Sequence, residues 1–191
     1  MPKLTPASDE KIAYQGRMIE IVNQDMTDGK KTITFELARR APGIRLILVN
    51  KDKKTVTLSK EHRYELGGFD YRLPGGKVFD SLDEYNQFLD AKSDILIPAK
   101  AKALAEAEEE VGLRLNSVEH YHTSFCGATI RWDLIYFVCN DWEEVDQKLE
   151  AGEVISRSTV PIEEAKELAL NGGMSEERSA LVLLRYLSSL A

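Results

Sequence analysis

The sequence predicts an α+β protein in which helices cover both faces of a mixed β-sheet. Several short segments either alternate apolar and polar residues or are purely aliphatic, which is typical of half-buried and buried strands. These segments are residues 31–38, 44–49, 55–59 and 132–138. Segments with helical spacing lie between the strands and at the C-terminal end. Strands interrupted by helices favour layers of helix, sheet and helix.

The first part of the chain is predicted to form a small β extension. Residues 14–22 are interpreted as one strand, and a polar turn at 27–30 leads into the strand at 31–38. Arginine, proline and glycine then break the pattern. We therefore expect an extension over residues 1–42 and a main domain over 43–191.

Two helices are predicted in the middle of the chain. The segment from Ser81 to Glu84 has the form of a capping box, so a short helix is expected over 82–91. Residues 99–113 are almost entirely strong helix formers. Pro98 suits the first helical position of that segment, and Gly112 suits its end.

Composition limits the possible functions. The chain has 191 residues, 43% of them hydrophobic, and a net charge of −7, which argues against nucleic-acid binding. No apolar run is long enough for a membrane span, and no secretory signal is visible at the start. Cys126 and Cys139 lack metal-type spacing and are predicted to be reduced, buried thiols. We expect a cytoplasmic protein that does not bind membranes.

Three glutamates of the 99–113 helix are predicted to share one side of it. Each residue advances by about 100°, which brings Glu106, Glu109 and Glu110 within roughly a third of the circumference and turns Glu108 away. Like charges at this spacing repel one another. No lysine or arginine in the following turn is placed to neutralise these charges. A hard divalent cation with oxygen ligands is the natural candidate for a counter-charge.

These residues carry a resemblance to a known family. The chain from Leu73-Pro74-Gly75-Gly76 to Leu113 resembles the Nudix box of the Nudix hydrolase superfamily. The residues that match the second half of the box are Glu106, Ala107, Glu109, Glu110, Gly112 and Leu113. The strand order around the turn and the "G-E-x-I … P-I-E-E-A … G-G" tail are similar to the ADP-ribose and nucleotide-sugar pyrophosphatase branch.

The resemblance implies a Nudix-type α/β/α sandwich with a mixed β-sheet, plus a small N-terminal β extension that helps the chain form a homodimer. It also implies that Glu106, Glu109 and Glu110 hold Mg²⁺, or Mn²⁺, against a diphosphate. Glu106 and Glu110 correspond to the main ligands, and Glu109 to a supporting or bridging one. The implied catalytic residues are Glu109 and Glu153, because Glu153 lies in the region where related pyrophosphatases place a base.

The resemblance also suggests residues that bind the substrate. Arg63 stands where related enzymes carry a segment that contacts the nucleotide. It could bind a phosphate through two hydrogen bonds, but an ordinary surface arginine is an equally good interpretation. Arg72 precedes the turn and is a second candidate for phosphate. Gly75 and Gly76 allow close approach of the backbone, which fits a ligand or a tight turn.

Three departures from the box leave the activity open. Ala105 occupies the position of the family's arginine, which pairs with the carboxylate at position 109. The first glutamate of the box is absent, and an insertion at about residues 78–97 precedes the helix. The first reading is a hydrolase that cleaves the diphosphate of ADP-ribose or a nucleotide sugar. The alternatives are a catalytically weak Nudix-fold protein that binds or senses nucleotides, and an acidic α+β interaction domain.

Overall fold

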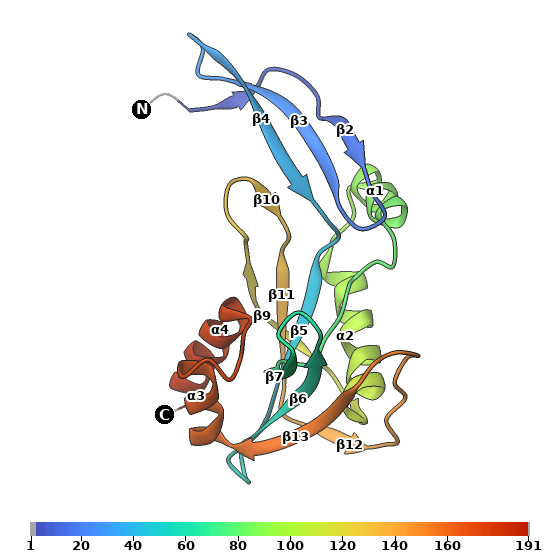
Figure 1. Cartoon of the computed structure of the whole chain (residues 1–191), viewed down its shortest axis with the longest axis vertical. Coiled ribbons are helices and arrows are strands. Elements are labelled where there is room, and N and C mark those ends of the chain that lie inside the picture. Colours follow the sequence, from blue (N-terminus) through green and yellow to red (C-terminus); the bar gives the residue numbers. More distant parts are fainter. Residues whose placement is uncertain (1–2, 191) are drawn as a thin grey trace. The chain divides into compact units, whose positions relative to one another are not determined.

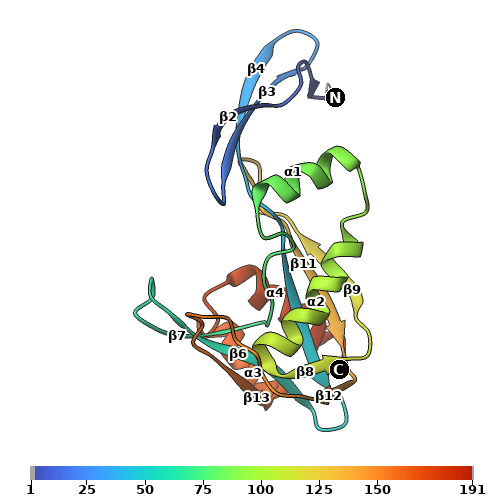
Figure 2. The ribbon, with the colours of Figure 1, turned by 90° about the vertical axis from the view of Figure 1, so that its right-hand side faces the viewer.

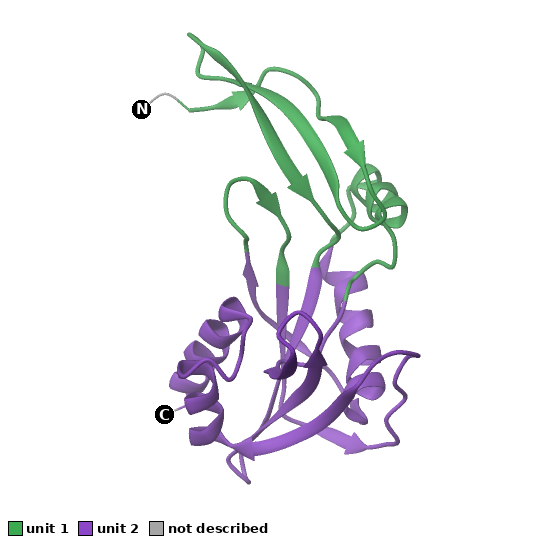
Figure 3. Ribbon diagram, viewed as in Figure 1, with its two compact units in different colours: residues 1–42, 77–94, 125–134 green, residues 43–76, 95–124, 135–191 purple. Residues whose placement is uncertain are grey.

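The computed structural model describes residues 3–190 and divides the chain into two compact units, shown in different colours in Figure 3. Unit 1 consists of residues 1–42, 77–94 and 125–134, and unit 2 of residues 43–76, 95–124 and 135–191. Unit 1 thus contains the predicted N-terminal extension and also most of the predicted insertion.

Unit 1 is built on a five-stranded sheet. Its strands are β1 (Thr5–Pro6), β2 (Lys11–Gln15), β3 (Glu20–Thr27), β4 (Thr32–Arg39) and β10 (Ile130–Arg131). The order is β1-β3-β4-β10, with β2 also pairing with β3 and β10 running parallel to β4. The prediction of one strand over 14–22 is wrong, because Gly16 N donates to Ile19 O over 2.9 Å and turns the chain between β2 and β3.

The short helix of unit 1, α1 (Leu82–Ala91), begins and ends as predicted. The Ser81 side chain accepts a hydrogen bond from Glu84 N over 3.2 Å, which satisfies one of the free amides of the first turn. Lys92 adopts a left-handed conformation and ends the helix.

Unit 2 is built on a six-stranded sheet with the order β13-β6-β5-β11-β9, in which β7 also pairs with β6. Its strands are β5 (Gly43–Asn50), β6 (Thr55–Arg63), β7 (Gly68–Arg72), β9 (Glu119–Ser124), β11 (Leu134–Cys139) and β13 (Ile155–Pro161). A separate antiparallel pair joins β8 (Leu113–Leu115) to β12 (Trp142–Glu144). Strands β5 and β11 are buried almost throughout, as their aliphatic sequences predict.

Helices lie on both faces of this second sheet (Figures 1 and 2). Helix α2 (Leu96–Val111) packs on one face, against β5, β6 and β13. Helices α3 (Ile162–Leu170) and α4 (Glu177–Ser188) pack against each other on the opposite face. The predicted helix, sheet and helix layers are confirmed. Between residues 3 and 190, the structure contains no helix with the length and apolar character that a membrane span requires.

Helix α2 differs slightly from its prediction at the start. It begins at Leu96, so Pro98 is its third residue, a position in the first turn where a missing amide hydrogen still costs nothing. Its end is as predicted, because Gly112 adopts φ +62° and stops the helix.

Candidate active site

Two of the three predicted glutamates are buried on the inner side of α2. Glu106 and Glu110 are 8% and 9% exposed and lie one turn apart, whereas Glu109 is half-buried. The same stripe of the helix contains Ala103 and Ala107, both fully buried, whose small side chains let the helix lie close to the sheet. Carboxylates are rarely buried without a partner. This buried pair of carboxylates is therefore the candidate functional site on α2.

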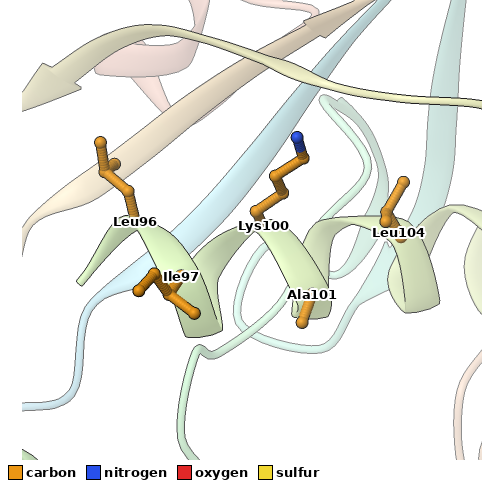
Figure 4. Close-up of a pocket in the computed structure, with 5 residues that line it drawn as sticks. All are labelled: Leu96, Ile97, Lys100, Ala101 and Leu104. Carbon is orange, nitrogen blue, oxygen red and sulfur yellow. The ribbon is translucent and has the colours of Figure 1, made fainter. Parts of the chain in front are cut away.

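The other side of α2 is apolar and has a different character. A shallow surface hollow of about 450 Å³ lies there (Figure 4). The residues that line it are Leu96, Ile97, Lys100, Ala101 and Leu104. None of them carries a carboxylate, so this hollow is separate from the cluster of Glu106 and Glu110.

The Gly75–Gly76 turn is held directly against the buried carboxylates. Gly75 N donates to Glu110 Oε2 over 2.7 Å, and Ile44 N on β5 donates to Gly76 O over 2.9 Å. A Cβ atom on Gly76 would lie 2.0 Å from Glu106 Oε1, so a larger residue there would displace this carboxylate. Both predicted glycines therefore belong to the same cluster as the glutamates.

Burial changes the protonation of this pair. It raises the pKa of Glu110 to about 8, although the Gly75 amide lowers it, and the charges of Glu106 and Glu153 add to the increase. Burial also raises the pKa of Glu106, against the lowering effect of Lys102. A cation bound beside them would stabilise their charged forms and so lower both pKa values.

One of the predicted carboxylates already has a cation beside it, which corrects the sequence analysis. Lys102 Nζ lies 3.4 Å from Glu106 Oε1, one helical turn before it. This lysine lies in the turn before the glutamates, not in the turn that follows them. Within residues 3–190, no Lys, Arg or His nitrogen lies within 4.0 Å of the Glu110 carboxylate, whose direct partner is the Gly75 amide.

We predict that Glu110→Gln stabilises the metal-free protein at alkaline pH. The folded-state pKa of Glu110, about 8, exceeds its ordinary value of 4.5. The stability contributed by the protonated carboxyl is therefore complete below about pH 4.5 and is lost as the pH rises through 8. Glutamine stays neutral, so the free energy of unfolding of the variant should exceed that of the wild type by up to a few kcal/mol above pH 8.

Calorimetric melting in a chelating buffer at pH 5, 7 and 9 measures this difference. Glu108→Gln is the matched control, because Glu108 lies on the same helix but pairs with Arg114 on the surface. A difference between Glu110→Gln and the wild type that stays constant with pH would contradict the prediction.

The loop that follows β12 is fastened to the C-terminal end of α2. Lys148 N donates to Glu109 O over 3.1 Å, and Gln147 Nε2 donates to both Glu110 O and Ile155 O. These donors satisfy carbonyl groups that have no partner inside the helix. Gln147 was not predicted from the sequence. Its only signal there is that the end of a buried helix needs hydrogen-bond donors from elsewhere in the chain.

The same loop places Glu153 near the buried pair. Glu153 Oε2 accepts from Glu150 N over 2.9 Å, and Glu153 N donates to Glu150 O over 3.2 Å, which closes a small turn. The charge of Glu153 contributes to the raised pKa values of both Glu106 and Glu110. The structure thus brings this predicted catalytic residue into electrostatic range of the predicted metal ligands.

The two predicted substrate-binding arginines are engaged with carboxylates on the β6–β7 hairpin. Arg63 Nη1 lies 2.9 Å from Glu61, and Arg63 Nε lies 2.7 Å from Glu65. Arg72 Nη1 lies 3.1 Å from Asp70, and its Nε lies 3.5 Å from Glu61. Their charges are therefore already largely balanced by neighbouring acids.

The donor set of the site consists of oxygen atoms. Glu106 and Glu110 supply two buried carboxylates and Glu109 a half-buried one, and such ligands suit a hard divalent cation. With the side chains as they stand in residues 3–190, no group of three or more His, Cys, Asp or Glu side chains is arranged to hold a metal ion.

Comparisons with known proteins agree with this architecture at the level of the fold. A crystal structure of an ADP compounds hydrolase matches 96% of this chain and 93% of its own, with a TM-score of 0.66 and 15% identity. This match confirms the predicted α+β sandwich.

One curated protein is similar in sequence. The CMP-5'-(N-acetyl-N-hydroxy-3-aminopropyl)phosphonate hydrolase of Streptomyces rubellomurinus is 27% identical over 181 residues, which cover 93% of this chain and 80% of that protein. No family model matches the chain.

Proposed function

We propose that this protein is a Nudix-type hydrolase that cleaves the diphosphate bond of a nucleoside diphosphate linked to another moiety, such as ADP-ribose or a nucleotide sugar. The observation that carries the proposal is the pair of buried carboxylates, Glu106 and Glu110, held against Gly75 and Gly76. The two similar proteins support it, because one is named for the hydrolysis of ADP compounds and the other for that of a CMP-phosphonate.

Mg²⁺, or Mn²⁺, is proposed as the cofactor, with Glu106, Glu109 and Glu110 as its ligands. When bound, the ion would neutralise phosphate charge and lower the pKa of the attacking water. Glu110 is oriented for this role by the Gly75 amide, and Glu106 would exchange its ion pair with Lys102 for the metal.

Glu153 is proposed as the general base of the reaction. It would take the proton of the water that attacks one phosphorus, while the bond from that phosphorus to the bridging oxygen breaks and a nucleoside monophosphate leaves. Glu109, which is half-buried, would orient the ligands.

A substrate panel tests the proposed activity. The panel contains ADP-ribose, ADP-glucose, UDP-glucose and a CMP-phosphonate, each with Mg²⁺ or Mn²⁺. We expect metal-dependent release of a phosphomonoester from at least one of them, detected as inorganic phosphate after addition of a phosphatase. Absence of product across the panel with both metals would contradict the proposal.

A second candidate function is nucleotide binding or sensing without efficient turnover. Ala105 favours it, because alanine cannot orient Glu109, and so does the ion pair that Lys102 forms with Glu106. Calorimetry separates the two candidates: heat of ADP-ribose binding together with a flat activity assay would select the binding protein.

Substitution of Glu153 tests its role as the base. We predict that Glu153→Gln lowers kcat by about 10²- to 10⁴-fold with little change in melting temperature, since removal of a general base has effects of this size. Glu150→Gln is the matched control, because it alters the same loop and the same charge. If both variants lose activity equally, the loop rather than the Glu153 carboxylate is responsible.

The predicted homodimer and cytoplasmic location stay predictions. Unit 1 supports the homodimer, because it exposes large apolar side chains on its strands and turns. These are Leu4, Ile12, Tyr14, Ile19, Ile33 and Ile130. Light scattering of the full chain measures the oligomeric state directly, and a monomeric mass at all concentrations would contradict the dimer.

A further inference from the structure

Strand β5 carries one charged side chain inside an aliphatic run. Arg45 is only 7% exposed and stands between Ile44 and Leu46, both fully buried. Removing a guanidinium from water is strongly unfavourable unless an anion or several hydrogen-bond acceptors accompany it. Residues 44–49 were predicted to form an aliphatic strand, and no role was predicted for this arginine.

The contacts of Arg45 do not neutralise its positive charge. Its Nη1 donates to Ile44 O over 2.7 Å. Among residues 3–190, no carboxylate oxygen lies within 4.0 Å of the guanidinium. Burial and the like charge of Arg72 hold its pKa below the usual range, and they outweigh the more distant charges of Glu176 and Glu110.

Arg45 differs in this respect from the arginines that the sequence analysis selected. Arg63 and Arg72 each contact two carboxylates on the β6–β7 hairpin. An incoming anion would have to compete with those acids for either of them, whereas Arg45 has no such competitor within 4.0 Å in residues 3–190.

A series of contacts connects Arg45 to the glycine turn. Ile44 O, which accepts from Arg45 Nη1, also lies so close to Gly75 that a Cβ there would be 2.3 Å away. Gly75 N in turn donates to Glu110 Oε2. The positive charge of Arg45 is felt at Glu110, where it lowers the pKa. The guanidinium therefore belongs to the neighbourhood of the buried carboxylates.

We propose that Arg45 binds the diphosphate group of the substrate beside the Gly75 turn, an inference that rests on the proposed function. The hydrogen bond from Nη1 to the main chain orients the planar guanidinium, and its remaining N–H groups would donate to two phosphate oxygens. A charge with little water around it attracts an anion more strongly than an exposed one. The ligand class is a nucleoside diphosphate derivative, recognised by its charged diphosphate.

Binding of inorganic pyrophosphate, with no turnover involved, tests the proposal. Titration calorimetry in a chelating buffer, and again with Mg²⁺, compares the full-length wild type with Arg45→Met, Arg45→Lys and Arg114→Met. We expect Arg45→Met to bind about tenfold or more weakly and Arg45→Lys to be intermediate, because lysine keeps the charge but loses the planar fork. Arg114→Met, at an exposed arginine paired with Glu108, should bind as the wild type does.

Each outcome has a definite meaning. Wild-type affinity in a folded Arg45 variant, or no pyrophosphate binding by the wild type with or without Mg²⁺, overturns the proposal. If Arg45→Met does not fold, Arg45→Lys decides. A raised KM with a smaller change in kcat for Arg45→Lys supports a role in binding. If the KM for a cleaved substrate is unchanged in Arg45→Lys, the proposed role of Arg45 is wrong but the proposed hydrolase activity is still supported. If the wild type binds pyrophosphate through Arg45 but cleaves no substrate of the panel, the role of Arg45 is supported and the proposed hydrolase activity is wrong.

Discussion

Glu110→Gln is expected to reduce kcat/KM on the order of 10³-fold, since a metal ligand supplies several kcal/mol of charge stabilisation to the transition state. Glutamine keeps the shape of Glu110 and an oxygen that accepts from Gly75 N, so the turn should remain in place. What it removes is the negative charge that a divalent cation needs. The same substitution relieves the cost of a buried charge, so activity and stability should change in opposite directions.

The control for this experiment lies two residues earlier. Glu108→Gln removes an identical group from the same helix, but Glu108 pairs with Arg114 on the outside and should leave kcat/KM within about twofold of the wild type. Calorimetric titration with Mg²⁺ completes the test. Equal Mg²⁺ affinity in the wild type and in Glu110→Gln would show that the metal is not held by this carboxylate.

Opposite signs for activity and stability would also separate the two candidate functions. A binding protein that had lost its metal chemistry would have little reason to keep Glu110 charged and buried, because Gln or Leu at this position avoids the desolvation cost. Glu110 stands at a place where its charged form raises the free energy of the folded state. That combination is typical of a functional site.

The sequence was sufficient to predict the parts of the site that are encoded locally. Helix α2, its end at Gly112 and the shared side of Glu106 and Glu110 follow from spacing along one helix, whereas the burial of that side was not predicted. The capping of α1 by Ser81 likewise depends on neighbouring residues. Local rules succeed in these cases because the interacting groups lie within one or two turns of each other.

The rest could not be predicted, because it depends on contacts between distant segments. Arg45 meets the site only because the glycine turn packs against β5, some thirty positions later in the chain. Gln147 contacts the end of α2 across a similar separation. Periodicity marks a residue as buried or exposed, but it carries no information on which segment will lie opposite. The ion pair between Lys102 and Glu106, by contrast, was predictable, because the two residues lie one turn apart on the same helix.

Gly75→Ala and Gly76→Ala should have different consequences although the residues are adjacent. Gly75 has φ +146°, which L-residues rarely adopt, and a Cβ there would lie 2.3 Å from the main-chain oxygen of Ile44. Neither atom can move without shifting β5, so Gly75→Ala should cost about 2–4 kcal/mol of stability. At Gly76 the Cβ would meet the carboxylate end of Glu106, 2.0 Å away, which can rotate aside.

Gly76→Ala should therefore leave the melting temperature nearly unchanged but displace a proposed metal ligand. We expect a weakened Mg²⁺ affinity and a loss of kcat/KM of about 10²-fold, because misplacement of a reacting group by 1 Å has effects of this size. Thermal melting and Mg²⁺ titration of both variants measure the two effects independently. If Gly76→Ala keeps full Mg²⁺ affinity and activity, the position of Glu106 beside the turn does not contribute to metal binding or catalysis. The proposed metal ligands would then be Glu109 and Glu110 without Glu106.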